Sequence, residues 1–96
     1  MSKISKLAEL RKLMLEMERS IGLLDLSPVE RDIYYAATDL SNALNGVRTT
    51  DLLDHKLVVE VSRPTFFRAL KSLVSRGYLI QAQETGRGQY TVKSLD

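Results

Sequence analysis

Hydrophobic residues recur at alternating spacings of three and four along the N-terminal part of the chain. The repeat runs through Leu7, Leu10, Met14, Met17, Ile21 and Leu24, with charged residues between its members. Such spacing places apolar side chains on one side of an α-helix. The pattern therefore predicts an amphipathic helix over residues 3–23, within an N-terminal segment that we bound at residues 1–25.

The apolar side of this helix has two possible uses. Because the repeat is shorter than three heptads, which is marginal for a coiled coil, the helix can dock on the core of its own chain. Leu13 widens the apolar stripe, however, and a helix ahead of a compact domain is a common means of dimerisation. We favour a homodimer, with docking within the chain as the alternative. The predicted dimerisation residues are Leu7, Leu10, Met14, Met17 and Ile21.

A second helix is predicted from Pro28. Ser27-Pro28-Val29-Glu30 has the form of a capping box with proline at the first helical position. The apolar residues on one face of this helix are Val29, Ile33, Ala36, Ala37, Leu40 and Leu44. Asn45 and Gly46 are expected to end it. Tyr34 and Tyr35 are expected to pack half-buried rather than to form a binding platform.

A third, short helix is predicted over residues 51–56, with Thr49 or Thr50 as its cap and with Leu52 and Leu53 turned inward. The next segment, residues 57–61, is rich in valine, and β-branched side chains disfavour a long helix. We therefore expect a turn or a brief extended link there.

A fourth helix opens at Ser62 and Pro64. Arg63 is expected at its cap, because a residue before proline resists the α conformation. The buried stripe of this helix consists of Phe66, Leu70, Leu73 and Val74. Gly77 is expected to end the helix after Arg76, since a left-handed residue commonly follows a helix.

Two short strands are predicted at residues 78–83 and 89–92, and the segment 84–88 between them supplies two glycines for a turn. This makes a β-hairpin with Arg87 at its tip, and a lone hairpin is stable only against other elements. The sequence therefore predicts a mainly α protein of the α+β class. Its hairpin lies against the helices of a domain at residues 26–96.

The composition of the chain excludes several kinds of site and segment. The 96 residues suit one domain, and 44% hydrophobic with 27% charged residues is ordinary for a globular chain. Without cysteine the chain has no disulfide, thiolate nucleophile or zinc ribbon. No apolar run approaches the roughly 18 residues that span a bilayer, and the charged N-terminus is unlike a signal peptide. We expect a cytoplasmic protein with no membrane partner.

Charge is distributed unevenly. Residues 1–61 hold 8 Lys or Arg against 10 Asp or Glu, a balance of −2, whereas residues 62–96 hold 6 against 2, a balance of +4. Residues 61–79 alone hold four positive charges and no negative charge. Basic residues gathered in one part of a chain are typical of a surface for a polyanion. A solvated basic face without a partner is the alternative.

The predicted order of helix, short helix, turn, basic helix and hairpin describes a winged helix-turn-helix, whose second paired helix can enter a DNA major groove. The stretches SRPTFFRAL (62–70), RGYL (76–79) and GRGQY (86–90) resemble the recognition helix and wing of bacterial winged-helix transcription regulators, broadly of the MarR-like type. The resemblance covers about residues 49–92, and the turn between the paired helices departs from it by lacking glycine. It implies a transcription regulator that binds double-stranded DNA with residues 63–76 in the major groove and residues 84–88 at the minor groove, whereas the homodimer is predicted from the N-terminal helix.

The candidate DNA-binding side chains follow from the helical period. When Phe66, Leu70 and Leu73 face inward, the opposite side carries Arg63, Thr65, Arg68 and Ser72, with Phe67 at its flank. Arg68 can donate two hydrogen bonds to a guanine, or it can meet only solvent or a phosphate. The side chains suited to phosphates are Ser62, Arg63, Thr65 and Lys71. Ser62 can equally be no more than a helix cap.

For two side chains, Phe67 and Arg87, the sequence is compatible with two different roles. Phe67 either completes the core beside Val74 or stays exposed to contact a thymine methyl group. Arg87 stands between two glycines and has little packing purpose at a hairpin tip. We favour its insertion into or across the minor groove over a merely solvated turn.

An enzyme is not expected. His55 is the only histidine, and no HExxH, glycine-rich phosphate loop or paired-carboxylate motif is present. No cluster of metal ligands occurs, no cofactor is predicted, and nothing identifies a small-molecule effector. The alternative function is a winged-helix protein-interaction module without specific DNA binding. Such a module has no need of the basic cluster of Arg63, Arg68, Lys71, Arg76 and Arg87.

Overall fold

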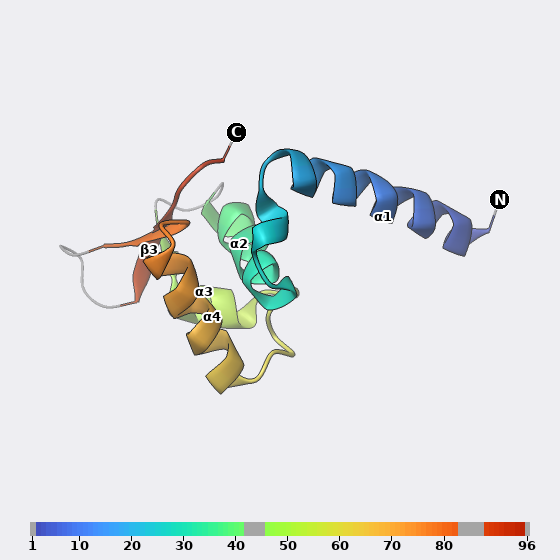
Figure 1. The fold of residues 1–96 in the computed structure, drawn as a ribbon. Coiled ribbons are helices and arrows are strands. Elements are labelled where there is room, and N and C mark those ends of the chain that lie inside the picture. Colours follow the sequence, from blue (N-terminus) through green and yellow to red (C-terminus); the bar gives the residue numbers. More distant parts are fainter. Residues whose placement is uncertain (1, 42–45, 83–87, 96) are drawn as a thin grey trace.

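The computed structural model describes residues 2–41, 46–82 and 88–95. Its helices are α1 (Lys3–Ser20), α2 (Pro28–Ser41), α3 (Thr49–Asp54) and α4 (Arg63–Ser75), with a short 3-10 helix, η1 (Leu23–Asp25), after α1 (Figure 1). The strands β1 (Val47–Arg48), β2 (Leu79–Gln81) and β3 (Gln89–Val92) form a three-stranded antiparallel sheet in the order β1-β3-β2. The described chain is mostly helical with a small sheet, which is compatible with the predicted α+β class.

β3 is the central strand of the sheet. Val92 of β3 lies opposite Leu79 of β2, and Tyr90 of β3 lies opposite Val47 of β1. The pairing of β2 with β3 confirms the predicted hairpin strands, although β2 is shorter than residues 78–83. β1 is absent from the sequence prediction, because two residues are too few to show the alternation of a strand. Its pairing fastens the start of α3 to the hairpin.

The core lies between α2, α4 and one face of the sheet. Ile33 and Ala36 of α2, Phe66 and Leu73 of α4 and Leu79 of β2 are each at most 1% exposed. Within the described residues the predicted apolar faces of α2 and α4 are confirmed, and the partly buried members are Val29, Leu40 and Val74. Burial of these faces seats α4 against α2. Leu44 lies outside the described residues.

The start of α2 confirms the predicted capping box. The backbone N–H of Ser27 donates to Oε1 of Glu30 at 2.9 Å, and the N–H of Glu30 donates to Oγ of Ser27 at 3.2 Å. This reciprocal pair satisfies amide groups that have no partner within the helix. Farther along α2, Tyr34 is buried and Tyr35 is half-buried, and both pack on the core. Asn45, at the predicted end of the helix, lies outside the described residues.

α1 ends earlier than the hydrophobic repeat predicts. It stops at Ser20 instead of residue 23, because Gly22 takes a left-handed conformation with a φ of 83°. The chain turns there, and Leu23 and Leu26 enter the core with 2% and 3% of their surface exposed. Leu24, the last member of the repeat, therefore belongs to η1 and not to α1.

The helices α3 and α4 also begin at other residues than the sequence predicts. α3 starts at Thr49, directly after β1, with Arg48 and not a threonine at its cap. α4 starts at Arg63 with Ser62 as its cap, so the expectation that Arg63 is the cap is wrong. Oγ of Ser62 accepts a hydrogen bond from the N–H of Thr65, and this cap stabilises the earlier start despite the proline that follows. The residues between the two helices form turns, as predicted.

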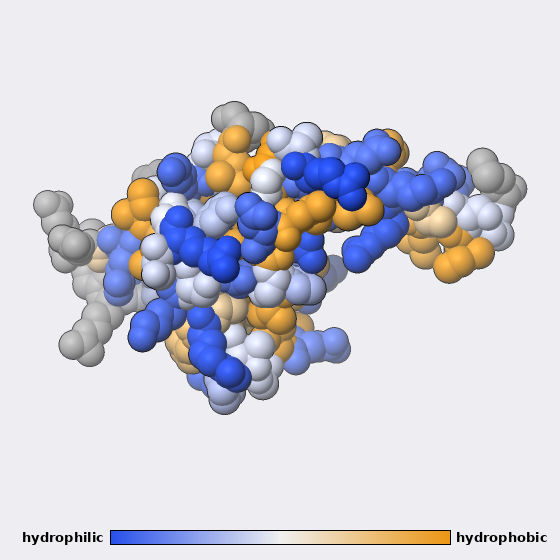
Figure 2. All heavy atoms as spheres, viewed as in Figure 1, coloured by the Kyte–Doolittle hydropathy of each residue, from blue (hydrophilic) through white to orange (hydrophobic). Residues whose placement is uncertain are grey.

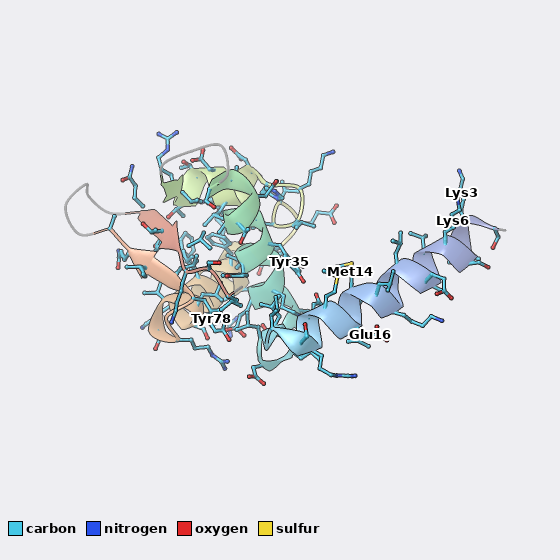
Figure 3. The ribbon with its side chains drawn as sticks, turned by 90° about the horizontal axis from the view of Figure 1, so that it is seen from above. Lys3, Lys6, Met14, Glu16, Tyr35 and Tyr78 are labelled. Carbon is cyan, nitrogen blue, oxygen red and sulfur yellow. The ribbon has the colours of Figure 1, made fainter. Side chains whose placement is uncertain are left out.

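α1 projects from the rest of the molecule, which we call the body and define as the described residues from 23 to 95 (Figures 1 and 3). The molecule is therefore 51 Å long and 26 Å across in each other direction. No residue of α1 is buried, and hydrophobic side chains reach the surface along the projecting helix (Figure 2). The structure thus does not show the alternative in which the apolar stripe of α1 docks on the core of its own chain.

Gly88→Ala should destabilise the protein. Gly88 has a φ of 84°, and a Cβ there would lie 3.2 Å from Oγ1 of Thr49, whose N–H donates to the Gly88 carbonyl at 2.8 Å. We expect the free energy of unfolding to fall by about 1–2 kcal/mol, because the left-handed conformation is unfavourable for a residue with a Cβ. Chemical denaturation measures this change.

Gly46→Ala is the matched control. A Cβ at Gly46 would lie 4.0 Å from the nearest atom, the carbonyl oxygen of Tyr90, so this variant should unfold like the unmodified protein. Equal losses in the two variants would contradict the fixed geometry described for the base of the hairpin.

Candidate nucleic-acid interface

Hydrogen bonds hold α4 at both ends. At its start, Oγ of Ser62 accepts from the N–H of Thr65 at 3.4 Å and donates to Oγ1 of Thr65 at 2.9 Å. At its end, Gly77 has a φ of 84°, and the N–H of Tyr78 donates to the carbonyl of Leu73 at 2.9 Å. This is a Schellman motif, which confirms the predicted end of the helix at Gly77. Ser62 is therefore the helix cap.

One side of α4 faces solvent and is basic. The exposed residues on it are Arg63, Pro64, Phe67, Arg68, Lys71 and Ser75. Within the described part of the chain, none of its three cations forms an ion pair with a carboxylate. Cations that are not neutralised within the chain can bind the phosphates of a nucleic acid.

Arg68 and Thr65 lie at the edge of this face nearest to α2. Together with Ser72 and Glu30 they line a shallow cleft of about 330 Å³. Nε of Arg68 donates to the carbonyl of Pro64 at 3.4 Å, which directs the side chain along the helix. Lys71 is exposed three residues farther on, so Arg68 and Lys71 share the basic face.

Ser72 contacts α2, although the helical period places it on the exposed side. Its Oγ donates to Oε2 of Glu30 at 2.5 Å, and Nε of Arg76 lies 3.9 Å from the same oxygen. Nη1 of Arg76 donates to the carbonyl of Asp25 at 3.2 Å. These contacts join the last turn of α4 to the start of α2 and to η1. In the structure Ser72 and Arg76 position α4.

Glu30 is the buried charge of this contact, with 7% of its surface exposed. Burial alone would raise the pKa of its carboxyl group, but the hydrogen bonds from Ser72 and Ser27 and the charge of Arg76 outweigh burial and lower the pKa. The folded protein therefore stabilises the carboxylate form of Glu30.

Phe67 stays at the surface with 46% of its area exposed. Its ring meets the buried ring of Phe66 edge to face, with 5.0 Å between the centroids and an interplanar angle of 81°. It also lines a shallow cleft with Lys71 and Gln81. Of the two alternatives for Phe67, the structure shows the exposed one.

The hairpin completes this side of the molecule. β2 follows α4 directly, and the base of the hairpin is bonded to the start of α3 through Gly88 and Thr49. Arg87, at the predicted tip, and residues 84–86 lie outside the described residues. The place of Arg87 at the minor groove therefore stays a prediction.

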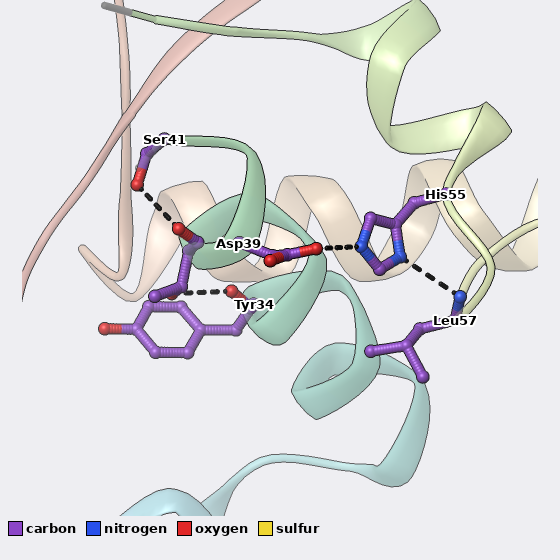
Figure 4. Close-up of polar contacts among 6 residues, drawn as sticks. Tyr34, Asp39, Ser41, His55 and Leu57 are labelled. Atoms are coloured by element: carbon purple, nitrogen blue, oxygen red, sulfur yellow. Dashed lines mark hydrogen bonds and ion pairs between the residues drawn. The ribbon is translucent and has the colours of Figure 1, made fainter. Parts of the chain in front are cut away.

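The turn between α3 and α4 is joined to α2 by the chain's single histidine (Figure 4). Nδ1 of His55 accepts from the N–H of Leu57 at 3.1 Å, and Nε2 lies 2.8 Å from Oδ2 of Asp39. Because Nδ1 is an acceptor, the neutral ring carries its proton on Nε2 and donates it to the carboxylate. His55 thus joins a turn that lacks glycine to α2.

The predicted dimerisation residues all lie on α1 or at its end. Leu7, Leu10 and Met17 are 56–68% exposed, whereas Met14 and Ile21 are 44% and 41% exposed. Met14 is less exposed because it lines a cleft of about 480 Å³ between α1 and the body. In Figure 3 Met14 and Glu16 extend from opposite sides of α1. The structure leaves the predicted seam open to solvent.

A hydrogen bond joins α1 to α2. The hydroxyl of Tyr35 donates to Oε2 of Glu18 at 2.5 Å. Burial, together with this bond, raises the pKa of Tyr35 to about 12, so the hydroxyl keeps its proton and remains a donor. The bond helps to set the direction in which α1 leaves the body.

Two side chains of this region are missing from the sequence prediction. Ser75 is exposed on α4 one helical turn after Lys71, and that spacing is a signal that could have identified it. Asp39 is the partner of His55, and no local pattern connects residues on different elements.

The described residues show neither a metal site nor a membrane-spanning helix. In the ranges 2–41, 46–82 and 88–95, no group of three or more His, Cys, Asp or Glu residues is arranged to hold a metal ion. None of the helices described has both the length and the apolar character needed to cross a membrane.

Protein-family models, curated proteins and solved structures include no match to this chain. The function is therefore inferred from the fold and from the exposed face of α4.

Glu30→Gln should weaken the contact between α2 and α4 by about 1–3 kcal/mol at neutral pH, because hydrogen bonds to a charged acceptor become bonds to a neutral one. The pKa of Glu30 in the folded protein is lowered from its ordinary value of 4.5. Its carboxylate therefore contributes stability above that value, and this contribution is lost as the pH falls through the folded-state pKa. The variant should lose less stability in acid than the unmodified protein, as measured by urea denaturation at several pH values.

Glu9→Gln is the control for this variant. Glu9 pairs with Lys12 at 3.0 Å, but the two side chains are 65% and 68% exposed, and such pairs contribute little. Indistinguishable stabilities and pH profiles for the two variants would rule out the role assigned to Glu30.

Proposed function

We propose that the chain is a sequence-specific transcription regulator that binds double-stranded DNA as a homodimer through a winged helix-turn-helix. The observation that carries this proposal is the exposed basic face of α4, a helix that contains no acidic residue. α4 is the recognition helix in the major groove. Residues 84–88 form the wing at the minor groove.

The order of the elements supports the proposal. α3 and α4 are consecutive helices joined by a turn, and the hairpin strands β2 and β3 follow them. β1 precedes α3 and pairs with β3, so the same sheet holds the start of the helix pair and the hairpin together. A hairpin fixed beside a recognition helix can reach the DNA next to the groove that the helix occupies.

The exposed side chains of α4 divide by their chemistry. Arg68 has the planar guanidinium that donates two hydrogen bonds to O6 and N7 of a guanine. Lys71 and Arg63 neutralise phosphates, which adds affinity without choosing a sequence. Phe67, exposed beside Lys71, can contact a thymine methyl group. Arg87 is assigned to the minor groove on its sequence position alone.

Ser62 and Thr65 stand at the N-terminal end of α4, where the helix favours an anion. Their hydroxyls are bonded to each other, and Thr65 is half-buried. We assign them a secondary contact with a phosphate at the edge of the groove. Ser72 has a smaller part, because its hydroxyl is bonded to Glu30.

α1 supplies the contact between the two copies. Its apolar stripe is exposed in the single chain, and a homodimer would bury it. A two-fold axis would then place the two recognition helices on a palindromic site whose half-sites lie about one helical turn of DNA, roughly 34–36 Å, apart. Regulation follows from occupancy, since the bound dimer blocks or recruits the polymerase.

Lys71→Ala should weaken binding to all duplexes alike and reduce the slope of log K against log salt by about one. Arg68→Ala should instead remove the preference at one base pair, at a loss of about 1–3 kcal/mol on the preferred sequence. Titrations of labelled duplexes of preferred and random sequence, followed by fluorescence anisotropy at several salt concentrations, separate the two effects.

Arg19→Ala is the matched control, because it removes the same charge from an exposed position on α1, away from α4. It should bind preferred DNA like the unmodified protein. If the three variants lose affinity equally, α4 is not the recognition helix. If the unmodified protein fails to bind DNA even at low salt, the protein-interaction function replaces the one proposed.

A further inference from the structure

α1 exposes an unusual amount of apolar surface for a helix in water. The exposed apolar side chains, each 41–71% accessible, are Ile4, Leu7, Leu10, Leu13, Met14, Leu15, Met17 and Ile21. A contiguous apolar surface of this kind marks a contact with another molecule. The homodimer proposed above supplies a second copy of α1 as the occupant, and the charges on the helix determine how the two copies lie.

We propose that the two copies of α1 pair antiparallel, with Leu10 of one copy against Ile21 of the other and Met14 against Met17. This inference rests on the proposed homodimer and specifies its seam. Leu7, Met14 and Ile21 occupy the a positions of a heptad repeat, and Leu10 and Met17 occupy the d positions. In an antiparallel pair each a residue lies opposite a d residue, and in this register the two-fold axis crosses α1 between Met14 and Met17.

Charges beside the stripe favour this direction. The charged residues that flank it on the e and g positions are Lys6, Arg11 and Glu18. A parallel pair would set Lys6 of one copy beside Arg11 of the other, and like charges repel. An antiparallel pair sets Arg11 of each copy beside Glu18 of the other, which gives two attractive contacts. A shift by one heptad would bring the two copies of Arg11 together, so the charges also select the register.

The balance of charge along α1 agrees with this direction. Residues 3–12 hold four basic residues and one acidic residue, whereas residues 13–20 hold one basic and two acidic residues. Figure 3 shows Lys3 and Lys6 toward the end of α1 that is farthest from the body. In the proposed register residues 3–12 of each copy lie opposite residues 19–28 of the other, so an antiparallel pair keeps the two basic halves apart. A parallel pair would place the two basic halves together.

The body has apolar clefts where an antiparallel partner would reach it. Ile21 and Tyr35 line a cleft of about 390 Å³, and Met14, Tyr35 and Leu57 line the cleft of about 480 Å³ between α1 and the body. In this register the N-terminal half of an antiparallel partner extends past the end of α1, with its Leu7 opposite Leu24 of η1, toward the part of the body that borders both clefts. Burying this surface adds stability to a two-helix seam that is marginal by itself. A parallel partner would keep its N-terminal half far from the clefts.

Cysteine cross-linking tests the direction, because the chain has no cysteine of its own. Full-length Leu10→Cys and Ile21→Cys are oxidised separately and as an equilibrated mixture. The antiparallel seam predicts a covalent dimer in the mixture only. Copies of the same position would lie roughly 16 Å apart along the seam at a rise of about 1.5 Å per residue, beyond the roughly 4.4–6.8 Å between the Cα atoms of a disulfide.

Sedimentation of the unoxidised protein separates failure of this inference from failure of the homodimer. A monomer at the concentration used for cross-linking overturns both. A dimer that cross-links through Leu10→Cys alone and through Ile21→Cys alone is parallel, and it overturns the antiparallel seam while keeping the homodimer. A dimer that gives no cross-link under any of these conditions also overturns the antiparallel seam and keeps the homodimer.

Arg11→Glu provides a second test that needs no cysteine. It replaces two attractions by two repulsions in the antiparallel pair, so the dimer dissociation constant should rise about tenfold. In a parallel pair it would create attractions to Lys6 and tighten the dimer, so the dissociation constant would fall instead of rising. Lys12→Glu is the control, because Lys12 lies on the side of α1 away from the stripe and pairs with Glu9. It should leave the dissociation constant near that of the unmodified protein.

Discussion

The packing of α4 against α2 is the contact on which the rest of the described structure depends. Phe66 and Leu73 of α4 bury their side chains in the same core as Ile33 of α2. Apolar contact alone permits small shifts of one helix on another, whereas the charged hydrogen bond from Ser72 to Glu30 has a defined geometry. The buried face and the polar contact together fix which side of α4 meets solvent. That side carries the cations from which the proposed function follows.

Three sets of hydrogen bonds fix the neighbouring elements relative to α2 and α4. The Schellman motif at Gly77 turns the chain from α4 directly into β2. The bond between Thr49 and Gly88 joins the base of the hairpin to the start of α3. His55 joins the turn before α4 to Asp39 of α2. The helix pair and the hairpin are thus held in one arrangement, as a surface for double-stranded DNA requires. α1 stands apart from it, so the proposed dimer contact and the proposed DNA contact occupy separate surfaces.

Features with a local cause could be predicted from the sequence, and features with a distant cause could not. The capping box at Ser27, the glycine that ends α4 and the buried faces of the helices depend on neighbouring residues, and the described structure confirms them. β1 exists only because β3 lies beside it, and Ser72 turns to Glu30 across 42 positions of sequence. Helical period alone therefore placed Ser72 with the exposed residues. The exposure of Phe67 does not follow from the sequence for the same reason, since it depends on how α4 meets the sheet.

Selection of bound sequences from a random duplex library, carried out with the purified protein at two salt concentrations, tests the proposed regulator most directly. The proposal predicts one enriched palindromic motif whose half-sites lie about one helical turn apart. It also predicts that the motif persists at the higher salt concentration, because base contacts discriminate between sequences after phosphate contacts have weakened. Binding without any enriched motif, or no binding at the lower salt concentration, would contradict the proposal.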